Sequence, residues 1–139
     1  EQCLNEYYPP IKEILVMKNS SIAAIKKGVG TIDEMLQYCC NYSRNKNDNV
    51  SSHQIRNIFS LIQSVGDNDL QGLHLIRPKL AYIGSRQRND SGKIIVRVLD
   101  SLIKSIEESK SAEEIELQIK GLKRVMESIV AYHKFHSNN

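Results

Sequence analysis

The sequence predicts an all-α protein in which five or six helices form a single compact bundle over residues 1–139. Apolar residues return every three or four positions along most of the chain, the spacing that places them on one face of an α-helix. Sustained alternation of apolar and polar residues, which is typical of a half-buried strand, is absent. The length suits one hydrophobic core without disulfides or metal, and neither a repeat nor a linker divides the chain. We therefore expect one helical domain.

Three short motifs predict helix starts, because a hydroxyl followed three positions later by Glu or Gln can form a capping box. The pairs are Thr31 with Glu34, Ser51 with Gln54 and Ser111 with Glu114. A first helix is expected within about residues 10–27, broken or softened near residues 19–21 and ended at Gly28, since glycine often follows a helix C-terminus. The helix opened at Thr31 is expected to reach about Tyr42, and the asparagine-rich segment 41–49 predicts a mobile loop.

Apolar stripes predict the remaining helices, since each repeats at helical spacing and would face the core. The stripes are Ile55, Ile58, Phe59 and Ile62; Leu73, Ile76, Leu80 and Ile83; Ile95, Val98, Leu99, Leu102, Ile103 and Ile106; and Ile115, Ile119, Leu122, Met126 and Ile129. Pro78 lies inside the second stripe, and we expect a kink or a break there because proline lacks an N–H. Segments 66–69 and 89–92 are rich in Gly, Asn and Asp and predict turns.

The composition argues against membrane and secreted proteins. No run approaches the ~18 apolar residues of a membrane span. Acidic residues and prolines near the start do not fit a signal peptide, and a sequence without an initial Met leads us to expect a few preceding residues. Of the three cysteines two are adjacent, at positions 39 and 40, which suits neither a disulfide framework nor a zinc site. We expect a cytoplasmic protein without a metal or cofactor.

Positive charge is concentrated in the middle of the chain. Between Gln71 and Leu99 the basic residues are Arg77, Lys79, Arg86, Arg88, Lys93 and Arg97, against the single acid Asp90. This segment carries a net charge of +5, whereas the whole chain carries +3. Such asymmetry is typical of a protein that binds a polyanion, although a solvated basic face would give the same count.

Lys79, Tyr82 and Arg86 are spaced i, i+3 and i+7, so on a helix they form one stripe beside the apolar face. Two cations that bracket a tyrosine suit nucleic acid, because the cations neutralise phosphates while the ring stacks on a base or packs against a sugar. Arg88, Lys93 and Arg97 are expected to extend the same charge. The alternative is that Tyr82 covers the edge of the core and the cations are only solvated.

Candidate catalytic groups are few, so we do not expect an enzyme. Gly28–Gly30 lacks the third glycine and the preceding strand of a phosphate-binding loop. The acids of segment 107–116 are explained as a solvated helix end. His133 and His136 could share a helical face, but without an HExxH pattern or a nearby acid they do not predict a metal site. Cys39 is expected to be a buried structural thiol.

Three short segments occur in an order that is more specific than any one of them. They are Gln54-Ile55-Arg56; Leu75–Arg86, with its Arg-Pro-Lys start and its Ala-Tyr pair; and Glu127–Lys134, with Ala-Tyr-His-Lys. Together, over about residues 50–136, they resemble the small subunits of type III-A CRISPR (Csm) effector complexes. Ser128 departs from this pattern, where a small apolar residue is expected, and the N-terminal third resembles the family only loosely.

The resemblance implies a helical, non-catalytic subunit of a ribonucleoprotein used in antiviral defence. Such subunits line up in more than one copy beside other subunits, and they hold target RNA along the guide RNA without reading its sequence. By this resemblance the RNA contacts are Gln54, Arg56, Arg77, Lys79, Arg86 and Arg88, to which the charge pattern adds Tyr82. Phosphate contacts would supply affinity, and base pairing would supply specificity.

Two other functions fit parts of the sequence. A helical DNA-binding regulator would use the helix from Ser51 to read the major groove, although Arg56 is the single cation among its expected exposed residues. A structural bundle that binds only proteins would carry its basic segment incidentally. A regulator would prefer one duplex sequence, and a purely structural bundle would show no salt-dependent binding of nucleic acid.

Overall fold

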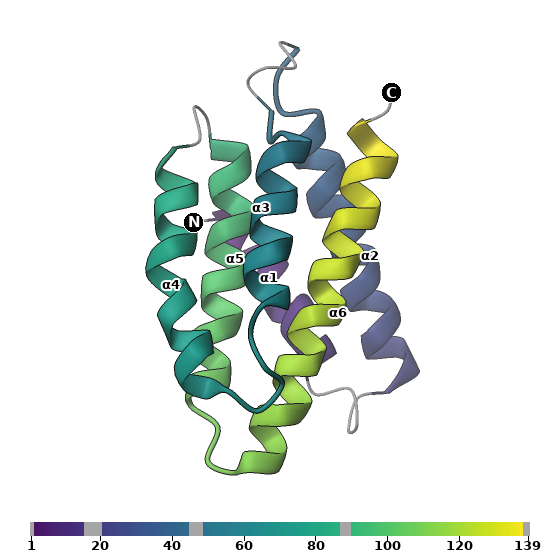
Figure 1. Ribbon diagram of the computed structural model, residues 1–139. Helices are drawn as coiled ribbons and strands as arrows, with labels where there is room; N and C mark the ends of the chain where they lie inside the picture. Colours follow the sequence, from purple (N-terminus) through teal and green to yellow (C-terminus); the bar gives the residue numbers. More distant parts are fainter. Residues whose placement is uncertain (1, 16–20, 45–48, 87–89, 138–139) are drawn as a thin grey trace.

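The computed structural model describes residues 2–15, 21–44, 49–86 and 90–137, which form six helices (Figure 1). In chain order they are α1 (Gln2–Leu15), α2 (Ile22–Cys40), α3 (Ser52–Gln63), α4 (Leu70–Ser85), α5 (Asp90–Glu107) and α6 (Ala112–Ser137). The described residues contain no strand, which confirms the all-α class. None of these helices is both long and apolar enough to cross a membrane.

The helices pack side by side around one core. The pair α4 and α5 forms one side of the bundle, α2 and α6 form the other, and α3 lies in front between α4 and α6 (Figure 1). Behind them α1 packs against α2, α5 and α6. The predicted stripe of α5 is completely buried, and the other three predicted stripes also reach the core. Phe59, Ile83 and Ile115 are partly buried and pack against its edge.

The predictions for the first two helices were wrong, because Gly28 does not end a helix. It lies inside α2 at a close contact with α1, where an added Cβ would be 2.8 Å from the Pro10 carbonyl oxygen and from Ile14 Cγ1. Thr31 is also internal, and its hydroxyl donates to the Lys27 carbonyl at 2.7 Å. The N-cap of α2 is Ser21, whose side chain accepts from the Ala24 N–H at 3.1 Å.

The later helix starts follow the predicted chemistry. Ser51 and Gln54 form the complete capping box of α3. The Ser111 hydroxyl accepts from the Glu114 N–H at 3.1 Å directly before α6. At Pro78 we expected a kink or a break, and no break occurs, since α4 runs on to Ser85. This part of the helix surface is exposed, so water can reach the carbonyl that loses its partner.

The two polar connections are described in part. In segment 41–49, Asn49 donates to the carbonyls of Cys40 and Ser43 at 3.0 Å each and accepts from the Ser43 N–H at 2.9 Å. Residues 45–48 lie outside the described part. In segment 89–92, Ser91 and Gly92 belong to α5 rather than to a turn, and Asn89 lies outside the described residues.

Candidate nucleic-acid interface

A groove between α3 and α4 brings the predicted stripe together. Lys79, Tyr82 and Arg86 are exposed, and Tyr82 retains 63% of its accessible surface, so it lies outside the core as the helical projection predicted. The groove is lined by Asn57, Ser60, Leu61 and Ser64 of α3 and by Pro78, Lys79, Tyr82, Ile83 and Arg86 of α4. No carboxylate is among these residues, so the groove carries the positive charge of Lys79 and Arg86 beside a lining whose exposed surface is largely apolar.

Tyr82 and Arg86 are already in contact with each other. The Arg86 guanidinium carbon lies 5.7 Å from the centre of the Tyr82 ring, a cation–π distance. Lys79 makes no hydrogen bond or ion pair with a described residue. The arrangement therefore offers an exposed ring and two cations that have no carboxylate to displace.

Gln54 and Arg56 differ in side-chain exposure and in their hydrogen-bond partners. Gln54 is half-buried, and its Oε1 accepts from the Ser51 N–H at 3.2 Å, so this side chain supports the start of α3. Arg56 is exposed and has no partner among the described residues. On a helical projection Arg56 lies about 40° from Ser60, at the rim of the groove. Of these two predicted contacts, Arg56 is the one available to an anion.

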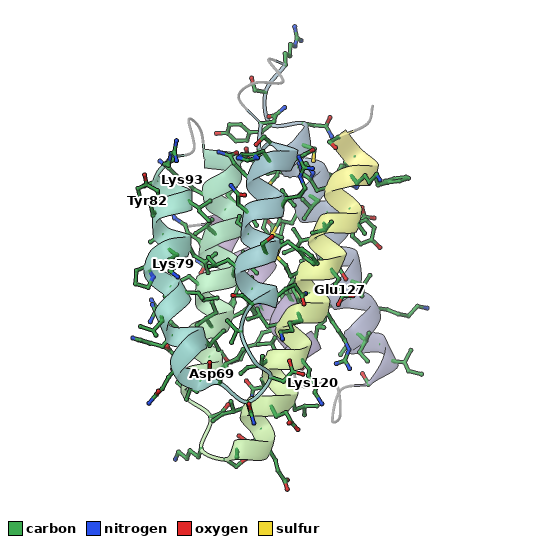
Figure 2. All side chains as sticks on the ribbon, in the orientation of Figure 1. Asp69, Lys79, Tyr82, Lys93, Lys120 and Glu127 are labelled. Carbon is green, nitrogen blue, oxygen red and sulfur yellow. The ribbon has the colours of Figure 1, made fainter. Side chains whose placement is uncertain are left out.

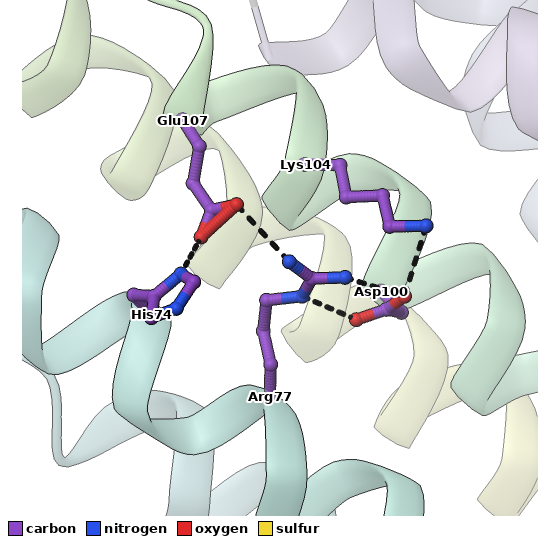
Figure 3. A network of polar contacts seen from close by, with 5 residues as sticks. All are labelled: His74, Arg77, Asp100, Lys104 and Glu107. Carbon is purple, nitrogen blue, oxygen red and sulfur yellow. Dashed lines mark hydrogen bonds and ion pairs between the residues drawn. The ribbon is translucent and has the colours of Figure 1, made fainter.

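Arg77 is held in a network between α4 and α5 (Figure 3). Its Nε and Nη2 donate to the two carboxylate oxygens of Asp100 at 2.8 and 3.3 Å, and its Nη1 donates to Glu107 at 3.2 Å. Glu107 also contacts His74, and Lys104 lies 3.9 Å from Asp100. The hydrogen bond to Asp100 is the main cause of the raised pKa of Arg77. Its charge is thus compensated within the protein.

The other two described cations of the basic segment do not continue the first groove. Lys93 and Arg97 of α5 line a second groove, between α4 and α5, together with Arg77. Figure 2 shows Lys79, Tyr82 and Lys93 along the same side of the bundle, all on or beside α4. Arg88 lies outside the described residues. The expected single stretch of charge is therefore divided by α4 into two rows.

The groups considered for catalysis have structural partners. Cys39 is fully buried and donates to the Ser91 carbonyl at 3.3 Å, in agreement with its expected role. Burial raises the pKa of Cys40 to about 11, which disfavours a reactive thiolate. His133 is buried with Nε2 3.0 Å from the Val50 carbonyl. Among the described residues no cluster of three or more metal-binding side chains is present.

His136 has an acidic neighbour that the sequence did not predict. We expected no acid near it, but its Nε2 lies 2.6 Å from Asp33 Oδ1 on α2. The pair joins the C-terminal end of α6 to α2, and the His136 side chain is only 10% exposed. Since the two residues are far apart in the sequence, their pairing could not be predicted from spacing.

The comparison with known families decides the identity of the chain. The family described as Csm2 Type III-A matches residues 30–139. The chain belongs to this family. It is therefore a small subunit of a type III-A CRISPR effector complex, and it assembles with the other subunits of that complex. No curated protein and no solved structure matches the chain.

The Csm2 match extends the region of resemblance. It begins within α2 and includes both walls of the α3/α4 groove, whereas the sequence motifs covered only about residues 50–136. Sequence reasoning missed the α3 wall of the groove and the carboxylates that compensate Arg77. Ser60 and Ser64 follow Arg56 at four-residue spacing, so the α3 wall could have been found as a polar stripe. The contact of Asp100 with Arg77 gives no such local signal.

Proposed function

We propose that this Csm2 protein is a non-catalytic RNA-binding subunit that holds target RNA along the guide RNA without reading its sequence. In this proposal it lies in the cytoplasm, in more than one copy, beside the other subunits of the effector complex. The observation that carries the proposal is the acid-free groove in which Lys79, Tyr82 and Arg86 are exposed together. Lys79 and Arg86 bind phosphates, and Tyr82 stacks on a base or packs against a sugar. Arg56 extends the contact at the rim.

Sequence-independent binding follows from the residue types. Phosphate contacts from lysine and arginine give affinity and register but carry no base information. The α3 wall offers Asn57, Ser60 and Ser64, whose short side chains can reach sugars and phosphates. Gln54 and Arg77 have structural partners, so we assign them supporting positions. Arg88 remains a proposed contact from the resemblance alone.

A salt titration with two unrelated single-stranded RNAs tests the groove. Lys79→Ala and Arg86→Ala should each weaken binding of both strands by a similar factor and lower the salt slope by about 0.7, the value for one single-strand phosphate contact. Each should change stability by less than about 0.5 kcal/mol, because the charges are exposed. Lys26→Ala, an exposed cation of α2, is the matched control. Unchanged affinity and slope in both groove variants would exclude the groove from the RNA path.

The same RNAs test the absence of catalysis. The purified chain should leave both strands uncut with and without divalent metal, since the pKa of Cys40 is raised and the buried His133 Nε2 donates to the Val50 carbonyl oxygen. Cleavage that follows the protein through purification and is lost in His133→Ala or His136→Ala would contradict the proposal. Duplex DNA of varied sequence serves as the competitor for the regulator alternative, which requires preference for one sequence.

A further inference from the structure

Helix α2 carries a row of exposed residues on its outer face. Every fourth residue from 22 to 38 is exposed, and this α2 row consists of Ile22, Lys26, Gly30, Glu34 and Tyr38. Residues four positions apart are neighbours on a helix, so the five positions form one continuous line. The helix lies at the side of the bundle opposite α4 (Figure 1), and neither basic groove includes it. The α2 row is therefore a surface that the proposed RNA site does not use.

Gly30, at the centre of the α2 row, is not required by the fold. No atom lies within 4 Å of the Cβ that another residue would add there. On the covered side of the same helix, by contrast, Gly28 admits α1. Glycine inside a helix costs about 0.5–1 kcal/mol relative to alanine. Gly30 thus leaves a flat point at which the backbone of another helix can approach α2 from outside.

The residues on either side of Gly30 are placed symmetrically. Lys26 and Glu34 lie four positions before and after it, and neither forms an ion pair with a described residue. Ile22 and Tyr38 lie eight positions before and after it, and they retain 78% and 42% of their accessible surface. Single exposed apolar residues are ordinary on a protein surface. The informative feature is the order along the row, which is apolar, basic, glycine, acidic, apolar.

This order makes the α2 row complementary to a reversed copy of itself. When two such rows run antiparallel and meet at Gly30, each Lys26 faces Glu34 of the other copy. Each Ile22 then faces Tyr38 of the other copy, so charge meets opposite charge and apolar meets apolar. Rows of residues at four-residue spacing interdigitate when two helices cross at about 50°, which is the commonest class of helix packing. The α2 row therefore fits a second copy of the chain.

We propose that the outer face of α2 binds a second copy of this chain as a two-fold, antiparallel helix pair that crosses at Gly30. Such a contact uses the same surface on both copies and closes at two, unlike the repeated contacts of copies that follow one another in a row. The inference goes beyond the proposed function, since the pair needs neither RNA nor another subunit. One helix per copy buries less than the roughly 1,200 Å² at which standard interfaces begin, so the pair is weak and reversible.

Reversal of one charge, and then of both, tests the pairing. Sedimentation equilibrium of the purified chain, at low salt and up to about 500 µM, should show a monomer–dimer equilibrium. Lys26→Glu or Glu34→Lys alone creates two symmetric like-charge contacts and should weaken association about tenfold. The double variant Lys26→Glu/Glu34→Lys recreates both pairs and should restore association to within about threefold. Lys110→Glu makes the same charge change at an exposed site between α5 and α6 and should have no effect.

Gly30→Ala separates association from folding. The added Cβ stands at the crossing point and should weaken association about tenfold, whereas the melting temperature should not fall because alanine favours the helix. Thermal melts of all variants exclude unfolding as the cause of any loss.

Four outcomes would overturn the inference. The first is a chain that stays monomeric over the whole concentration range, and the second is a chain that forms species larger than a dimer. The third is a dimer that neither single charge reversal weakens, or that the double reversal fails to restore, since another surface would then hold it. The fourth is unchanged association in Gly30→Ala, which would place the contact away from the centre of the α2 row.

Discussion

Arg77 and Asp100 join α4 to α5 through two parallel hydrogen bonds, from Nε to Oδ1 at 2.8 Å and from Nη2 to Oδ2 at 3.3 Å. This two-point geometry is the strongest form of an arginine–carboxylate pair. Both side chains are mostly covered, with 25% and 31% of their surfaces exposed. A residue in the most basic stretch of the sequence is thus committed to holding two helices together.

Replacing Arg77 should affect folding more than RNA binding. Arg77→Ala leaves Asp100 with Lys104, 3.9 Å away, as its one ion-pair partner among the described residues, so the free energy of unfolding should fall by about 1–2 kcal/mol, between the values for exposed and buried pairs. RNA affinity should change less than in Lys79→Ala, because the lost charge was compensated. Urea unfolding and RNA titration measure the two effects. A variant with normal stability but RNA binding as weak as in Lys79→Ala would show that Arg77 leaves the network for RNA.

The features that depend on local chemistry could be predicted from the sequence. Ser51 and Gln54 need only each other to cap α3, and the apolar stripe of α5 needs only the helical period. The exposure of Tyr82 also followed from its angle to the stripe of α4. These properties depend on residues within one or two turns of each other, so the order of the residues is sufficient.

The features that depend on the register between helices could not be predicted. Whether Arg77 faces RNA or Asp100 is decided by how α4 slides along α5, which no local pattern reports. The same holds for His136, whose partner Asp33 comes from the other end of the chain. Gly28 was misread for a related reason: a glycine that ends a helix and one that admits a neighbouring helix look alike in a sequence.

Gly28 and Gly30 provide a matched pair for the α1–α2 contact. Gly28→Ala should destabilise the fold by about 1–3 kcal/mol, because the new Cβ would be 2.8 Å from the rigid Pro10 carbonyl oxygen. Gly30→Ala should instead stabilise it by about 0.5–1 kcal/mol, since nothing lies within 4 Å and alanine favours the helix. Urea unfolding of both variants is the measurement. Equal effects of the two substitutions would contradict the close approach of α1 at Gly28.

The Cys40 thiol should react slowly in the folded protein. Burial raises its pKa from 9.0 to about 11, so near pH 8 its thiolate fraction, and with it the alkylation rate, is about 100-fold lower than for an ordinary thiol. The alkylation rate should keep rising with pH beyond 9. The free energy of unfolding should decline between pH 9 and about 11, because the Cys40 thiol ionises at lower pH in the unfolded chain than in the folded one. Iodoacetamide labelling followed by peptide mass spectrometry, with the urea-unfolded chain as control, measures this. Labelling as fast as in urea would contradict the burial.

Tyr82 separates a stacking role from a structural one. Because 63% of its surface is exposed and its ring makes a cation–π contact with the exposed Arg86, Tyr82→Ala should leave the thermal unfolding midpoint nearly unchanged. If Tyr82 stacks on a base, Tyr82→Ala should cost about 1–3 kcal/mol of RNA binding. The salt slope should stay unchanged, since no phosphate contact is lost.

Two further variants distinguish the aromatic ring of Tyr82 from its apolar bulk. Tyr82→Phe keeps the ring and should retain most of the affinity, whereas Tyr82→Leu keeps apolar bulk without a flat π face and should behave like alanine. Salt titrations with single-stranded RNA and parallel thermal melts give both readouts. If Tyr82→Ala lowered the melting temperature and Tyr82→Leu restored both stability and binding, the ring would serve packing between α3 and α4. The groove would then bind RNA through Lys79 and Arg86 alone.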